Sequence, residues 1–170
     1  MSPVILMLSM MVGATAWNDF SEWFSREGTP GAPADVLQAY SKKLAAGGVG
    51  EREIAARSEE VRKYMAAHPD EALVLHFNRI YTWGEAPFRR EPSELVKKVA
   101  GSRKPGRALD IAMGQGRNAV WLAKAGWNVS GYDISPVALR EAAASGAGRV
   151  RRRWGTWSPA VRPVARGTTR

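Results

Sequence analysis

Two aspartates and two glycines in the second half of the sequence are spaced for binding a nucleoside. Asp110 ends a short apolar stretch, Gly114 and Gly116 follow it closely, and Asp133 ends the next such stretch. Glycines remove the side chains that would keep a ligand from the backbone, and a helix that starts after them offers unpaired N–H groups. A carboxylate at the end of a neighbouring strand can accept both hydroxyls of a ribose. The pattern predicts a nucleoside-binding crevice.

The same glycines also fit a dinucleotide site. With Ala119 they match the G-x-G-x-x-G/A pattern, in which the start of a helix holds a pyrophosphate. Asp110 would place a negative charge near those phosphates, and Ala112 adds a small residue before the glycine pair. Both features favour a cationic ligand. A NAD(P)- or FAD-binding Rossmann oxidoreductase fragment remains the alternative.

The elements that must position these residues alternate between strand and helix. Ala108–Ile111 and Trp127–Tyr132 are short apolar strand candidates, and Asn118–Ala125 between them is predicted to be helical. A second helix is expected over Pro136–Ala144, where Ser135 can cap its start and proline takes the first helical position. This order predicts a right-handed βαβ unit and therefore the start of a parallel sheet.

The run Ala108–Ser135 resembles the class I S-adenosylmethionine-dependent methyltransferases. Their first motif reads D-x-G-x-G-x-G and is followed by an acidic residue at the end of the second strand. The stretch Gly114–Asn118, which reads Gly-Gln-Gly-Arg-Asn, is similar to bacterial methyltransferases that act on small molecules. The resemblance implies S-adenosylmethionine as cofactor and methyl transfer to a small-molecule acceptor, whose identity the sequence does not give.

The resemblance also implies which residues bind the cofactor, although it identifies no catalytic residue. Ala112 takes the place of the first glycine of the motif, and its methyl group could narrow the approach to the methionine moiety. The residues implied to bind the cofactor are Asp110, Ala112, Gly114, Gly116, Asp133 and Ile134.

The N-terminus has features of an export signal. Val4–Ala14 is uncharged and leads to Ala14-Thr15-Ala16, a small-x-small site of the kind that follows a signal peptide. We therefore expect a possible signal peptide over residues 1–16 and export to the periplasm or the medium, with a cytoplasmic location as the other possibility. A buried N-terminal helix is the alternative interpretation. The run is too short to span a bilayer, which takes about 20 residues.

The predicted fold class is α/β: N-terminal helices followed by the first βαβα portion of a Rossmann-like methyltransferase sheet, which is incomplete. We expect a linker over residues 17–34, a helical lead-in or lid over 35–100, and the N-terminal part of a methyltransferase domain over 104–146. Residues 147–170 are expected to form an irregular basic tail.

Composition limits the other functions. The 170 residues include no cysteine and two histidines, which excludes a disulfide scaffold and a cysteine nucleophile, and we expect no metal site. The net charge is +9, but seven arginines and no acid lie in residues 149–170, which leaves +2 for residues 1–148. Nucleic acid is therefore not the expected partner. A basic nucleic-acid-binding protein that uses Arg151–Arg153 with Trp154 and Trp157 is the third possibility.

The end of the sequence is short for a methyltransferase. Only 37 residues follow Asp133, and most of them lack strand or helix periodicity. We therefore expect a methyltransferase truncated by a frameshift or a sequence error. A sheet of two paired strands leaves an open edge and half a core, so we expect weak cofactor binding and doubtful activity from this chain alone.

Overall fold

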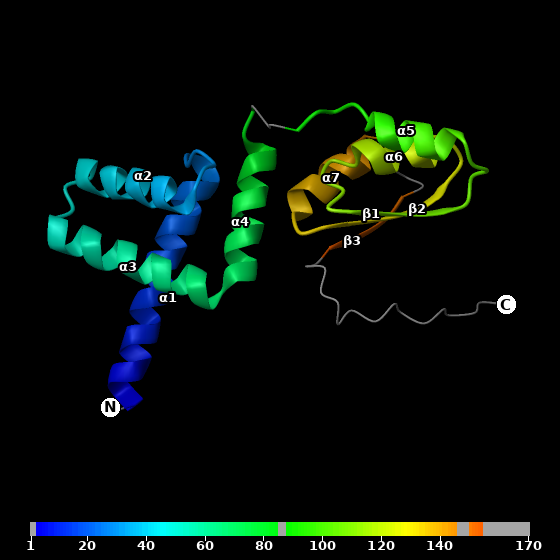
Figure 1. Ribbon diagram of the computed structural model, residues 1–170. Helices are drawn as coiled ribbons and strands as arrows, with labels where there is room; N and C mark the ends of the chain where they lie inside the picture. The colour runs from blue at the N-terminus through cyan, green and yellow to red at the C-terminus, as the bar shows by residue number, and fades with distance from the viewer. Residues whose placement is uncertain (1–2, 85–87, 146–149, 155–170) are drawn as a thin grey trace. The chain divides into compact units, whose positions relative to one another are not determined.

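The chain divides into two units that differ in secondary structure. The computed structural model describes residues 3–84, 88–145 and 150–154, and groups them into Met1–Phe88 and Arg89–Arg170 (Figure 1). The first unit is helical, and the second combines helices with a parallel sheet. Each unit is described by itself.

Four helices make up the described part of the first unit. Proline takes the first position of the second and fourth helices, where its missing N–H would be unpaired anyway. The break after the second helix falls at Gly47-Gly48, and Gly48 has a positive φ of 81°. The helices are α1 (Pro3–Arg26), α2 (Pro33–Ala46), α3 (Glu51–Ala67) and α4 (Pro69–Thr82).

Large aromatic side chains form the core of this unit. Phe20 is 2% exposed and meets the ring of Tyr40 edge-on, with 5.2 Å between ring centroids. Phe20 also stacks with Phe24 on the same helix, and Trp17 stacks on Tyr64 of α3 at 4.7 Å. Edge-on and offset rings are the favoured arrangements of aromatic pairs. Burial of these rings against α2 and α3 holds the helices together.

The first helix is longer than the sequence suggested. Residues 17–26, which we predicted as linker, continue α1, and only residues 27–32 of the predicted linker are non-helical. The reason is the apolar stripe of Ala16, Trp17, Phe20 and Phe24, all buried in the core. The helix also runs through the predicted cleavage site at Ala16. The signal peptide stays a prediction. Within the part of the chain that the structure describes, no helix is long and apolar enough to cross a membrane.

The second unit contains the predicted βαβα sequence, and its α/β class with a parallel sheet is confirmed. The strands lie in the order β1-β2-β3, and both pairs are parallel. Ser135 caps the last helix by accepting a hydrogen bond from the N–H of Ala138 at 3.2 Å. The elements are α5 (Glu94–Gly101), β1 (Arg107–Ile111), α6 (Arg117–Lys124), β2 (Asn128–Asp133), α7 (Pro136–Ala144) and β3 (Val150–Trp154).

The third strand corrects the prediction of an irregular tail from residue 147. Val150–Trp154 pairs along its whole length with β2, from Val129↔Val150 to Asp133↔Trp154. Val150 is 5% exposed and belongs to the core of this unit. The sequence VRRRW lacks the apolar alternation that indicates a strand, so its pairing depends on the backbone of β2. Residues 155–170 lie outside the described residues.

All three helices of the second unit pack on one face of the sheet (Figure 1). The shared core joins Ala100 of α5 with Ala119 of α6, Ala142 of α7 and Val129 of β2. This packing places α5 in the second unit, although we predicted it as the end of the helical lead-in over residues 35–100. On the other face of β1, Leu109 and Ile111 are 58% and 47% exposed.

Candidate functional site

The predicted site residues meet at the carboxyl ends of β1 and β2. Because the two strands are parallel and paired in register, Asp110 lies opposite Gly131, and the bend after β1 lies next to the end of β2. The backbone N–H of Gly114 in this bend donates a hydrogen bond to Asp133 Oδ2 at 2.7 Å. The structure thus brings the glycine bend and the second acid together, as the spacing of the motif predicts.

The bend takes backbone conformations that favour glycine. Ala112, Gly114 and Gly116 have φ values of 56°, 55° and 81°. Among the described residues Ala112 is the one non-glycine residue with positive φ. An L-residue with a side chain pays about 1–2 kcal/mol for the left-handed conformation. The residue that departs from the glycine motif is therefore the strained position of the bend.

Met113 fixes the bend against the sheet, and sequence reasoning missed it. Its N–H donates to the carbonyl of Tyr132 at 2.9 Å, and its side chain is 4% exposed. A Cβ placed on Gly131 would lie 2.1 Å from Met113 Sδ, and one placed on Gly116 would lie 3.2 Å from Met113 Cε. Both glycines therefore make room for the methionine. A glycine inside a strand, as at Gly131, was the available signal of such a close approach.

Asp133 is buried and already accepts two hydrogen bonds. It is the last residue of β2 and is 6% exposed. Its Oδ2 accepts a hydrogen bond from the N–H of Gly114, and its Oδ1 accepts one from the N–H of Ser135 at 2.8 Å. We expected a carboxylate that serves a ribose, whereas here it also ties the bend to the start of α7. Each carboxylate oxygen has a second lone pair, so Asp133 can hold both N–H groups and still accept hydroxyls. Ile134 follows it in the chain and is half-buried.

Asp110 has an oxygen that the described residues leave without a partner. Its Oδ2 is shielded from solvent and accepts no hydrogen bond from them. Burial raises the pKa of the Asp110 carboxyl, while a hydrogen bond from the backbone of Ala119 and the charge of Arg117 lower it. A buried acceptor without a donor is costly, which is a reason to expect a donor from a ligand. This oxygen fits a cationic group.

Two further contacts hold the bend in place. Gln115 Nε2 donates to Glu141 Oε2 on α7, so the tip of the bend is tied to the helix after β2. Asn118 Oδ1 accepts from the N–H of Ser93 at 2.9 Å and joins the start of α6 to the start of α5. Within the described ranges, no group of three or more His, Asp or Glu side chains could hold a metal ion.

Comparisons with known proteins cover this unit. Residues 86–143 match the family model described as tellurite resistance protein TehB. The match includes all six predicted site residues. No curated protein matches the sequence.

A solved structure also matches part of the chain. Its description is the conversion of a disulfide bond into a thioacetal group during echinomycin biosynthesis; it is 28% identical, with a TM-score of 0.34. The match covers 39% of this chain and 29% of that one. On the family match, the segment 86–143 is similar to a family of S-adenosylmethionine-dependent methyltransferases.

Proposed function

We propose that the crevice at the ends of β1 and β2 binds S-adenosylmethionine, and that the protein transfers the methyl group to a small-molecule acceptor. The observation that carries the proposal is the buried, unpartnered Oδ2 of Asp110 beside a glycine bend. S-adenosylmethionine, when bound, supplies a methyl group already activated on a sulfonium and a cationic amino group. A pyrophosphate would bring negative charge to the same place, which Asp110 disfavours.

Each predicted site residue has a proposed task. Asp110 would accept a hydrogen bond from the amino end of the cofactor, and Asp133 would accept the ribose hydroxyls with its remaining lone pairs. Gly114 would allow the ligand to approach the backbone, and Gly116, which leaves room for Met113, would hold the bend in the conformation that meets the ligand. Ile134 would add apolar surface next to the ribose. Ala112, exposed and in the left-handed region, would narrow the approach on the methionine side.

Transfer would require orientation more than acid–base chemistry. The chain's residues would hold the reacting groups close together, in line and away from water. We assign no general base. The acceptor is proposed to be a small molecule because the stretch Gly114–Asn118 resembles bacterial methyltransferases that act on small molecules.

We also propose that the three-stranded sheet is the first part of a larger methyltransferase sheet. Parallel sheets normally have both faces covered. Here the three described helices of this unit pack on one face, and Leu109 and Ile111 are exposed on the other. This arrangement supports the incomplete sheet that the sequence predicts.

The test is a titration of the full chain with S-adenosylmethionine, monitored by NMR because this method detects weak binding. We expect the amide signals of Ala112, Gly114 and Gly116 to shift, and Asp110→Asn to reduce the shift because it removes the negative charge. Glu27→Gln, an exposed carboxylate in the first unit, is the matched control and should change nothing.

Two outcomes would contradict the proposal. One is the absence of any shift in these amides with the folded chain. The other is an equal response to NADH with no effect of Asp110→Asn, which would favour the dinucleotide site instead.

A further inference from the structure

The first unit contains a hollow between α2 and α3 that lies outside the methyltransferase match. We propose that it binds a small carboxylate that also carries a hydroxyl group on an apolar body. The hollow has a volume of about 600 Å³, within the range of small-molecule sites. The proposal does not depend on the cofactor site, because all of its residues belong to the first unit.

The hollow is built by two helix faces with matched spacing. On α2 the lining includes Leu37, Gln38 and Ser41, and on α3 it includes Ser58, Arg62 and Met65. Residues three, four and seven positions apart lie on one side of a helix. Each helix therefore presents a polar group and an apolar group to the same space.

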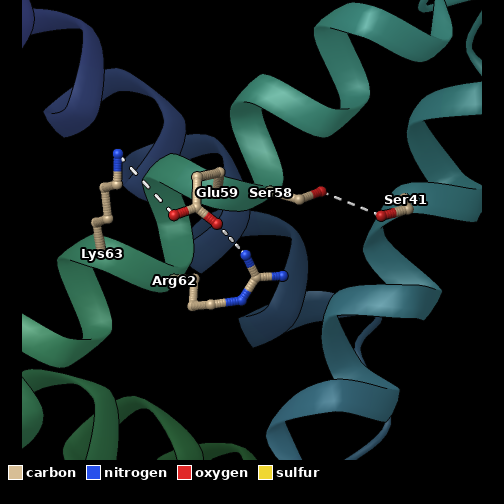
Figure 2. Close-up of polar contacts among 5 residues, drawn as sticks. All are labelled: Ser41, Ser58, Glu59, Arg62 and Lys63. Carbon is tan, nitrogen blue, oxygen red and sulfur yellow. Dashed lines mark hydrogen bonds and ion pairs between the residues drawn. The ribbon is translucent and has the colours of Figure 1, made fainter.

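Two serines join the helices and leave an acceptor in the hollow. Ser41 Oγ donates its proton to the carbonyl of Leu37 at 2.9 Å. Ser41 and Ser58 are 3.1 Å apart, oxygen to oxygen, and point toward each other across the gap (Figure 2). Because the proton of Ser41 is used, Ser58 must donate to it. Ser58 Oγ, in a residue only 9% exposed, then keeps its lone pairs and suits a ligand hydroxyl that donates.

Arg62, which lines the hollow, belongs to a group of three ion-paired side chains with a net positive charge. The Glu59 carboxylate lies between Arg62 and Lys63, and pairs with both (Figure 2). Two cations share one anion, so one positive charge remains. Arg62 lines the hollow and has further N–H groups beyond the one that meets Glu59. A ligand carboxylate can pair with them.

The order of these groups along α3 sets the shape of the ligand. Ser58 and Arg62 are one helical turn apart, so their backbone positions are separated by a rise of about 6 Å along the helix. The ligand should therefore carry its hydroxyl and its carboxylate at opposite ends of a short apolar body. That body would contact Leu37, which is 8% exposed and part of the aromatic core, and Met65, which packs against it. A para-hydroxylated aromatic acid has this form.

The experiment uses 4-hydroxybenzoate, benzoate and phenol as probes with the full chain, by isothermal calorimetry and NMR. We expect 4-hydroxybenzoate to bind more tightly than either compound that lacks one group. Arg62→Gln should weaken its binding by about tenfold or more, as loss of a charged hydrogen bond does. Ser58→Ala should remove the advantage of 4-hydroxybenzoate over benzoate and leave benzoate unchanged.

Two further variants separate the site from general effects. Glu59→Gln frees Arg62 and should tighten binding, a direction that damage to the fold would not produce. Arg52→Gln removes an exposed charge at the start of the same helix, away from the hollow, and should have no effect. The proposal is overturned if 4-hydroxybenzoate does not bind, if the three probes bind equally, or if Arg62→Gln and Arg52→Gln behave alike.

Discussion

The two units differ in the kind of side chains that form their cores. The first buries large rings, with Phe20 at 2% and Tyr40 at 0% exposure, whereas the second is packed with alanines such as Ala119 and Ala142, both fully buried. Small residues bring helix backbones close to a sheet but bury little apolar area each. The second unit therefore depends more on backbone pairing and on polar ties such as Gly114 to Asp133. This difference suits a bend whose backbone must be placed accurately.

The largest effect is expected from the aromatic core. Phe20→Ala should lower the free energy of unfolding of the first unit by about 3–5 kcal/mol, because it removes a buried ring and leaves a cavity. Urea unfolding followed by tryptophan fluorescence measures it. Leu73→Ala, at a residue 45% exposed on α4, is the control and should cost far less. Equal costs at the two positions would mean that the aromatic cluster does not hold this unit together.

The second effect tests the contact between the bend and the sheet. Gly131→Ala should lower the free energy of unfolding by about 1–3 kcal/mol, because the added methyl group overlaps Met113 Sδ. The double variant Gly131→Ala with Met113→Ala should recover stability relative to the sum of the single changes. Circular dichroism during urea unfolding measures all three.

The control for this pair is Gly101→Ala at the end of α5. Nothing lies within 4 Å of a Cβ placed there, so the change should be neutral or slightly stabilising. If the effects of Gly131→Ala and Met113→Ala on the free energy of unfolding are additive, Met113 and Gly131 are not in contact.

How far the sequence predicts the structure also differs between the units. The glycine bend was predictable because Gly114 and Gly116 take backbone conformations that other residues avoid, and their spacing from two acids is specific. The strand Val150–Trp154 was not, because its arginines carry no period-two signal. Met113 lies in the bend after β1 and Gly131 lies in β2. Periodicity along a single sequence does not predict a contact between two such distant positions. In α1, the uncharged residues at the start resemble an export signal, so we predicted a linker after them. We did not predict the stripe of buried residues that extends to Phe24.

The third prediction concerns Asp110, whose pKa is raised by burial and further by Asp133. An acid with a raised pKa in the folded state costs stability once it ionises, so stability is lost as the pH rises through that pKa. Asp110→Asn should therefore raise the free energy of unfolding at neutral pH, and the gain should vanish below the ordinary aspartate pKa of about 3.9. We expect a smaller effect than at Gly131, because Asp110 is only half-buried.

Urea unfolding of the wild type and of Asp110→Asn, at neutral pH and at a pH below about 3.9, measures this difference. Glu27→Gln is the control and should show no such gain. Asp110→Asn should also weaken the response to S-adenosylmethionine, so stability and binding would change in opposite directions. A gain of equal size at both pH values would mean that the charge of Asp110 is not the cause.

The smallest expected effect compares one backbone conformation in the two units. Gly48, between α2 and α3, has φ +81° and open space around its Cβ position, so Gly48→Ala should cost about 1 kcal/mol from the left-handed conformation alone. Ala112→Gly makes the reverse change in the bend at φ 56°. It relieves the left-handed strain, but glycine loses more chain entropy on folding, so the net stabilisation should be only a few tenths of a kcal/mol. Thermal unfolding of both variants measures the two changes. If Ala112→Gly instead destabilises the chain, the alanine methyl group makes contacts that exceed its strain, and the departure from the glycine motif would be a stabilising feature of the bend.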